Sequence, residues 1–151
     1  MTTLREGLVL EEVEENLYLG NRLAAVRQEH DHRFEYVVTV SRDREPMTTA
    51  YYPMRDGQGN DPEAFAEAVK SARYYYRSPG KVLVHCEAGI SRSTTVIATV
   101  LVAEKQARSF AHAVEQVREV RPDARPADAL IDAAEQYLGT TVDRSAIRAA
   151  E

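Results

Sequence analysis

Short runs of apolar and β-branched residues recur in the first half of the chain and predict strands. The segment YVVTV is apolar and β-branched, which is typical of a buried strand. Pro53 places the end of a later strand near a sheet edge or terminus. The predicted strands span residues 16–20, 36–40, 48–54 and 81–85.

The second half of the chain repeats its apolar positions at helical spacing instead. Residues 91–107 are apolar on nearly every side, so this segment predicts a helix buried in the middle of the domain. Asp61 followed by Pro62 is a typical helix start, because Asp caps free N–H groups and Pro fits the first turn. The predicted helices span residues 23–26, 62–76, 91–107, 110–120 and 126–138.

Strands come first, helices dominate later, and a strand, a loop and a helix follow one another at the centre of the chain. This order predicts an α/β fold with a single central mixed β-sheet and helices on both of its faces. We expect one domain over residues 1–151, with its core at about 9–138 and a frayed tail at 139–151. The acidic run EEVEE at residues 11–15 is expected to be a solvated face.

The composition narrows the class of protein. The chain has 151 residues, of which 44% are hydrophobic and 28% charged, so it is globular rather than disordered. Its net charge of −5 argues against nucleic acid or an anionic membrane as a partner. One cysteine cannot form an intramolecular disulfide, and neither a signal peptide nor a membrane-spanning stretch is visible. We therefore expect a cytoplasmic monomer.

The single cysteine stands in the segment VLVHCEAGISRS, between a predicted strand and a predicted helix. A loop that opens a helix directs unpaired N–H groups at one point, and the helix dipole adds positive potential there. Gly89 permits a tight turn, and Arg92 offers a forked donor that matches phosphate oxygens. The loop is therefore a candidate cradle for a dianionic phosphoryl group. Its expected lining residues are Glu87, Ala88, Gly89, Ile90, Ser91 and Arg92.

The same positive field favours the thiolate form of Cys86. A thiolate directly beneath a phosphoryl group suggests attack on phosphorus and a phosphocysteine intermediate. Ser93 can donate to the departing thiolate, and His85 is expected to orient the loop rather than to act as a base. The competing interpretation is that Cys86 is a small buried apolar side chain. It leaves the surrounding His, Gly, Arg and Ser unexplained.

The segment HCEAGISRS resembles the active-site signature of the cysteine-based protein phosphatases, H-C-x-x-G-x-x-R-S/T, and the dual-specificity branch in particular. NLYLG, YVVTVS and VREVRPDARP are similar, in the same order, to further segments of that family. The resemblance covers roughly residues 9–138. It implies a phosphatase that acts on phosphotyrosine, with or without phosphoserine and phosphothreonine. We expect the chemistry to need no metal or other cofactor.

The resemblance also implies an aspartate about thirty residues before the cysteine that protonates the leaving oxygen. Asp56 lies 30 residues before Cys86 and follows a Tyr-x-x-x-Asp pattern similar to the family's. Glycines that follow Asp56 permit the loop to move. Asp61 is the alternative acid, but its place as a helix cap explains it sufficiently.

The sequence departs from the family at the brace of the phosphate loop. The family often carries Pro-Asn after the Arg-Pro segment, whereas this chain has Pro126-Ala127. The brace is then missing or is supplied by Asp128 or another group. Glu87 stands in a loop where phosphoinositide-directed relatives tend to carry lysines, and its carboxylate repels a headgroup with several phosphates. A phosphorylated protein is therefore the favoured substrate.

Three other functions remain open at this point. A phosphoprotein-binding module of the same fold usually lacks the cysteine, the arginine or the acid, and this chain keeps all three. Sulfur transfer also uses a cysteine in an anion-binding loop, but His85, Arg92 and Asp56 favour phosphate. A phosphatase for a non-protein phosphate ester is the third.

Some polar residues gain no function from the sequence. His30 and His32 flank an aspartate on a polar loop without a third partner, so no metal site is predicted. Arg42 and Arg44 follow the second predicted strand and either contact a substrate phosphate or are merely exposed.

Overall fold

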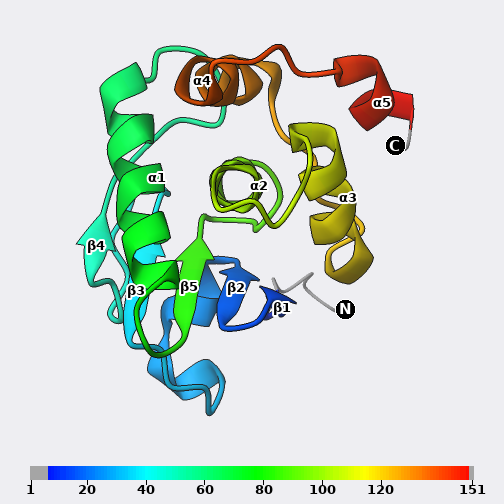
Figure 1. Cartoon of the computed structure of the whole chain (residues 1–151). Helices are drawn as coiled ribbons and strands as arrows, with labels where there is room; N and C mark the ends of the chain where they lie inside the picture. Colours follow the sequence, from blue (N-terminus) through cyan, green and yellow to red (C-terminus); the bar gives the residue numbers. More distant parts are fainter. Residues whose placement is uncertain (1–6, 150–151) are drawn as a thin grey trace, which may run out of the picture.

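The computed structural model describes residues 7–149, in which five strands form one mixed sheet (Figure 1). Their order across the sheet is β1-β2-β5-β3-β4, so β5 is the central strand. β1 pairs antiparallel with β2, and all other neighbours are parallel. The sheet confirms the α/β prediction. The strands are β1 (Leu10–Glu14), β2 (Leu17–Gly20), β3 (Tyr36–Thr39), β4 (Ala50–Tyr51) and β5 (Val82–His85).

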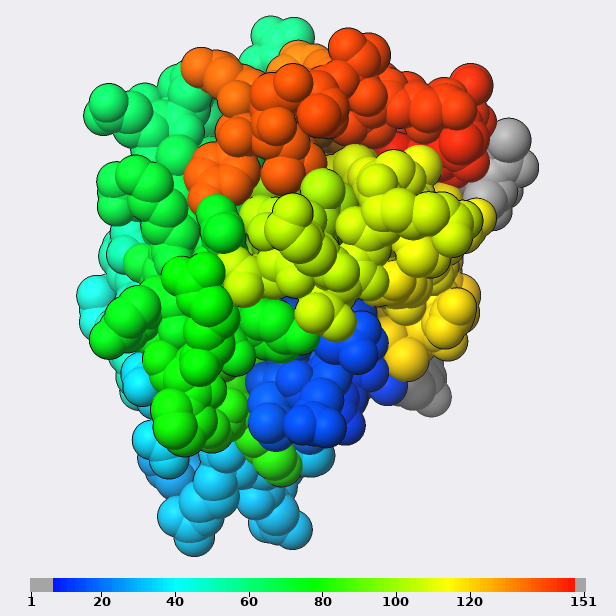
Figure 2. All heavy atoms as spheres, viewed as in Figure 1, coloured from blue at the N-terminus to red at the C-terminus, as the bar shows by residue number. Residues whose placement is uncertain are grey.

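The α-helices lie on one side of this sheet (Figure 1). α2 follows β5 directly and its residues from Ser93 to Leu101 are all buried, as its apolar pattern predicts. In the space-filling view, α1 in green lies on one side of the molecule and the β1–β2 hairpin in blue lies below (Figure 2). The helices are α1 (Pro62–Tyr76), α2 (Arg92–Ala103), α3 (Phe110–Val120), α4 (Asp128–Leu138) and α5 (Arg144–Ala149).

Two short 3-10 helices, η1 (Arg22–Ala25) and η2 (Arg27–Glu29), follow β2 on the other side of the sheet. Ala24 and Ala25 of η1 join the sheet residues Tyr18, Val37 and Leu83 in a small apolar cluster. Both faces of the sheet therefore carry helices, as expected, but the helices on the two faces differ in length. One face carries long α-helices, and the other carries only single turns.

Helix ends follow local side-chain and backbone chemistry. Asp61 caps α1, as predicted, by accepting from the Glu63 N–H at 3.0 Å. Ser109 caps α3 by accepting from the His112 N–H at 3.1 Å. α2 ends at Ala103, four residues earlier than predicted. Lys105 adopts a left-handed φ of 61°, and the next two N–H groups fold back onto the last turn of the helix, which terminates it.

Two segments differ from the sequence-based expectation. The acidic run is not simply a solvated face, because residues 10–14 form edge strand β1, which is held to β2 by main-chain bonds whatever its side chains. The tail is not frayed over 144–149, which form α5 with Ile147 only 1% exposed. Residues 150–151 of the expected frayed tail lie outside the described residues. No helix within residues 7–149 is long and apolar enough to cross a membrane.

Candidate active site

The loop from Cys86 to Ser91 joins the central strand β5 to the buried helix α2. It thus lies at the carboxyl end of parallel strands, where ligands of α/β sheets usually bind. Cys86 is 1% exposed at the base of the loop, whereas Glu87 and Ala88 are exposed at its tip. Both ends of the loop are therefore fixed by the core.

Every carbonyl group of this loop accepts a hydrogen bond from a group outside it, at 2.8–3.2 Å. The donors come from η1, the end of α3, the α3–α4 connection, the strand and the helix. For the carbonyls of Cys86 to Ser91 in order, they are His85 Nδ1, the Arg22 N–H, Arg121 Nη2, Arg121 Nε, the Arg125 N–H and the Thr95 N–H.

This pattern fixes the direction of the loop N–H groups. In a planar trans peptide the N–H points opposite to the preceding carbonyl, so outward carbonyls turn the N–H groups of residues 87–92 inward. Within residues 7–149, the N–H groups of Glu87 to Ser91 donate to no other protein group. Inward N–H groups of this kind bind the oxygens of a tetrahedral anion.

Gly89 is required by the shape of the loop. Its φ is 68°, in the region that L side chains rarely adopt. A Cβ at this position would lie 3.1 Å from the carbonyl carbon and oxygen of Gly20. The loop therefore closes against β2 only because no side chain is present there.

Cys86 and Ser93 face each other at the base of the loop. Cys86 Sγ and Ser93 Oγ lie 3.2 Å apart, and both residues are buried. Arg92, the first residue of α2, is half-buried, and its Nη1 donates to the carbonyl of Met54 at 3.1 Å. The geometry thus brings the predicted Cys86 and Ser93 together at the base of the loop, and Arg92 directly follows the loop.

His85 is held from both of its ring nitrogens. Nδ1 donates to the Cys86 carbonyl at 3.2 Å, because a carbonyl can only accept, and Nε2 accepts from the Thr39 hydroxyl at 2.7 Å. Thr48 Oγ1 lies 2.7 Å from Thr39 Oγ1 and extends the chain of bonds. Burial lowers the pKa of His85 from 6.5 to about 4, against the opposing effect of the bond to Cys86. His85 is therefore a neutral structural group.

The brace of the loop comes from Arg121 and the main chain of Ala127, for which the sequence predicts no role. The Ala127 N–H donates to Ser91 Oγ at 2.9 Å. The guanidinium of Arg121 holds the tip of the loop by donating to the carbonyls of Ala88 and Gly89. Asp128 does not supply the brace, because its carboxylate pairs with Arg148 at 2.9 Å. The only sequence signal for Arg121 is its place in the Arg-Pro segment.

The two candidate acids lie on the exposed loop between β4 and α1. Asn60 fastens this loop by accepting from the Arg55 N–H at 2.7 Å and donating to the Arg55 carbonyl at 2.8 Å. A pocket of about 430 Å³ beside Arg92 includes Asp61 in its wall, but not Asp56. The structure thus places the helix cap, and not the favoured acid, nearest to this pocket.

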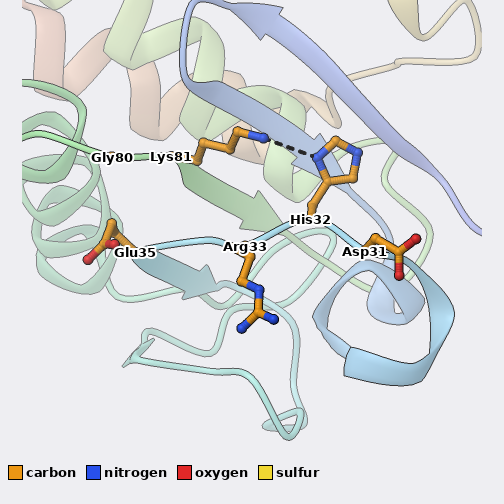
Figure 3. Close-up of a pocket in the computed structure, with 6 residues that line it drawn as sticks. All are labelled: Asp31, His32, Arg33, Glu35, Gly80 and Lys81. Carbon is orange, nitrogen blue, oxygen red and sulfur yellow. Dashed lines mark hydrogen bonds between the residues drawn. The ribbon is translucent and has the colours of Figure 1, made fainter.

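The histidine pair lies at the opposite end of the parallel strands. His32 lines a pocket before β3 and β5, where its Nδ1 lies 3.4 Å from Lys81 Nζ (Figure 3). His30 uses both ring nitrogens, since Nε2 lies 2.7 Å from the Ala24 carbonyl and Nδ1 accepts from the His32 N–H. Across residues 7–149, no three His, Cys, Asp or Glu residues are grouped so that they could hold a metal ion.

Comparisons with known proteins agree with this geometry. The family model "Dual specificity phosphatase, catalytic domain" matches residues 17–137. The chain is 32% identical over 132 residues to dual specificity protein phosphatase 1 of Arabidopsis thaliana, covering 82% of this chain and 66% of the relative. In general, the chain spans about two thirds or less of the length of the first curated relatives that it matches.

Solved structures show the same arrangement of elements. The crystal structure of human DUSP28 is similar with a TM-score of 0.69 and 26% identity, covering 85% of this chain and 91% of that one. A mouse putative dual specificity phosphatase, complexed with zinc tungstate, has a TM-score of 0.70 and 25% identity, covering 91% of this chain and 89% of that one.

The lowered pKa of His85 predicts a loss of stability in mild acid. The unfolded state binds the proton below about pH 6.5 while the folded state resists it down to about pH 4, so stability is lost as the pH falls through this window. Between pH 7 and pH 5 the free energy of unfolding should fall by about 2 kcal/mol from this group. Urea unfolding at the two pH values, compared between wild type and His85→Asn, measures the difference. An NMR titration in which His85 protonates near pH 6.5 would contradict it.

The contacts of Arg121 predict a specific effect on anion binding. Arg121→Ala leaves the carbonyls of Ala88 and Gly89 without their donor, so the loop N–H groups lose their fixed direction. We expect affinity for inorganic tungstate to fall by about tenfold, because hydrogen bonds to charged groups contribute ~1.5–3 kcal/mol. Calorimetry measures the affinity. The control variant Lys70→Ala removes an equal charge from α1 and should leave the affinity for tungstate unchanged. Equal affinities of wild type, Arg121→Ala and Lys70→Ala would exclude a bracing role for Arg121.

Proposed function

Because the chain belongs to the dual specificity phosphatase catalytic domain family, we propose that it hydrolyses phosphotyrosine in proteins, with or without phosphoserine and phosphothreonine, through a phosphocysteine intermediate. The observation that carries the proposal is the loop of inward N–H groups, which surrounds Cys86 and Ser93. A tetrahedral oxyanion of charge −2 suits such a cradle. Tungstate, the anion bound with zinc by the mouse relative, has the same tetrahedral shape.

In the first step, the thiolate of Cys86 attacks phosphorus and the bond from phosphorus to the ester oxygen breaks. Asp56 gives its proton to that oxygen, which leaves as an alcohol or phenol. The loop N–H groups and Arg92 stabilise the charge on the three equatorial oxygens, and one such preorganised donor typically contributes ~2.7–4 kcal/mol to the barrier.

In the second step, water attacks phosphorus and Asp56 takes up its proton. The bond from sulfur to phosphorus breaks, and Ser93, 3.2 Å from Cys86 Sγ, donates to the departing thiolate. Arg92 donates to the carbonyl of Met54, two residues before Asp56, and this contact supports the choice of an acid from the same segment. No step requires a metal ion.

The direct test is hydrolysis of an aryl phosphate and of a phosphotyrosine peptide in the presence of a chelator. Wild type should turn over both substrates, and Cys86→Ser neither, because the serine hydroxyl is a far weaker nucleophile than a thiolate. A wild type that binds the phosphopeptide without hydrolysing it would instead identify a phosphoprotein-binding module of the same fold.

A leaving-group comparison decides between the two candidate acids. Asp56→Asn should lower kcat by about 100-fold or more on a phosphotyrosine peptide but much less on an aryl phosphate with a good leaving group, because only the poor leaving group needs the proton. Asp61→Asn retains a capping side chain and should have a small effect on both substrates. The reverse pattern would assign the acid to Asp61, the residue in the wall of the pocket.

A further inference from the structure

We propose that Arg118 and Arg148 are positioning residues, which act on the phosphate loop (residues 86–91) through the connection between α3 and α4. Each guanidinium holds the carbonyl of one peptide group, and the N–H of the same peptide group holds the loop. The affinity of the loop for a phosphoryl group then depends on one side chain from α3 and one from α5. The inference rests on the proposed phosphatase function and adds two residues to its site.

The first of these peptide groups joins Ala124 to Arg125. Arg118 Nε donates to the Ala124 carbonyl at 2.9 Å. On the other side of the peptide group, the Arg125 N–H donates to the Ile90 carbonyl at 2.8 Å. In a planar trans peptide the carbonyl and the following N–H point in opposite directions, so a donor that fixes the one also aims the other. The Ile90 carbonyl belongs in turn to the peptide group of the Ser91 N–H, one of the inward donors.

The second peptide group joins Pro126 to Ala127. Arg148 Nη2 donates to the Pro126 carbonyl at 3.0 Å. The Ala127 N–H donates to Ser91 Oγ at 2.9 Å. Two guanidinium groups from different helices therefore act on the same end of the phosphate loop, one through its main chain and one through the Ser91 side chain.

Charge makes these bonds stronger than ordinary turn contacts. Hydrogen bonds with an ionised donor are roughly twice as strong as neutral ones, and bonds in a chain polarise one another. A guanidinium at the carbonyl thus makes the N–H of the same peptide group a better donor to the loop. Ala124 and Pro126 are both buried, so water has little access to either carbonyl if its arginine is removed.

Each guanidinium is itself held at a second point. Arg118 Nη1 donates to the carbonyl of the buried Ile147 in α5 at 2.9 Å, and α5 lies close to α3 (Figure 1). Arg148 Nη2 also lies 2.9 Å from the Asp128 carboxylate, whose side chain is largely exposed. An exposed ion pair contributes little, so we assign the effect of Arg148 to its bond with the carbonyl.

The experiment measures the affinity of the full chain for inorganic tungstate by calorimetry. Arg118→Ala and Arg148→Ala should each lower the affinity by about three- to tenfold, because each removes a charge-assisted bond that aims a donor to the loop. Arg148→Lys can still donate to the Pro126 carbonyl and should keep most of the affinity. Wild-type affinity in both alanine variants would refute the positioning role.

Two control variants change α5 or its ion pairs and leave both peptide groups in place. Arg144→Ala removes an equal charge from α5, where Arg144 pairs with carboxylates of α4. Asp128→Asn removes the carboxylate partner of Arg148 but keeps the Pro126 carbonyl. Both variants should keep the wild-type affinity. An equal fall in Arg144→Ala and Arg148→Ala would assign the effect to the docking of α5 as a whole and would overturn the proposal.

Amide hydrogen exchange separates a local change from unfolding. The Ala127 N–H should exchange faster in Arg148→Ala, and the Arg125 N–H in Arg118→Ala, whereas the N–H groups of the central strand β5 should keep their wild-type rates. Equal acceleration in β5 would mean that a variant loses affinity by unfolding, which would refute the role assigned to its arginine.

The two proposals fail in different ways. If all variants bind tungstate as wild type does, the positioning role is refuted and the phosphatase proposal is unaffected. If the two alanine variants bind tungstate more weakly but wild type hydrolyses no phosphate ester, the phosphatase proposal fails and the positioning role stands. A wild type that does not bind tungstate lacks the anion cradle that both proposals require, and refutes both.

Discussion

The direction of the peptide planes between Cys86 and Ser91 is the constraint on which the rest of the site depends. Each carbonyl of this loop is bound from outside, and the peptide geometry then turns the N–H groups towards one point. A buried polar group without a partner costs free energy, so inward N–H groups are stable only where an anion or water meets them. The anion site is thus built by the groups behind the loop as much as by the loop itself.

Those groups connect the loop to distant parts of the chain. The segment between α3 and α4 supplies Arg121 and the N–H groups of Arg125 and Ala127. α5 holds this segment in turn, since its Arg148 donates to the Pro126 carbonyl. Arg118 of α3 links the two, because it donates both to the Ala124 carbonyl in the segment and to the Ile147 carbonyl in α5. The C-terminal helix therefore supports the brace of the phosphate loop.

Sequence periodicity was sufficient for the parts of the fold that local chemistry determines. The β-branched strands, the all-apolar α2 and the caps at Asp61 and Ser109 follow from residues close in the chain. Edge strand β1 was missed because main-chain pairing, and not its acidic side chains, places it in the sheet. α5 was missed because it is held by ion pairs with residues distant in the chain, such as Arg148 with Asp128.

The same distinction holds within the site. Cys86, Gly89, Arg92 and Ser93 stand in one short motif, so their proximity could be predicted from spacing. Arg121 lies 32 residues beyond Gly89, and only the fold reveals that its guanidinium reaches the loop. The pocket wall at Asp61 is equally invisible in the sequence, because the spacing that favours Asp56 carries no information about which carboxylate faces Arg92.

Trapping the covalent intermediate tests the proposed chemistry of Cys86 without relying on any other residue. The protein is mixed with a phosphotyrosine peptide, quenched in acid during turnover, digested and analysed by mass spectrometry. We expect a single phosphoryl group on the peptide that contains Cys86, and none on the corresponding peptide of Cys86→Ser. Steady hydrolysis without any phosphoryl group on Cys86, or with one on another residue, would contradict it.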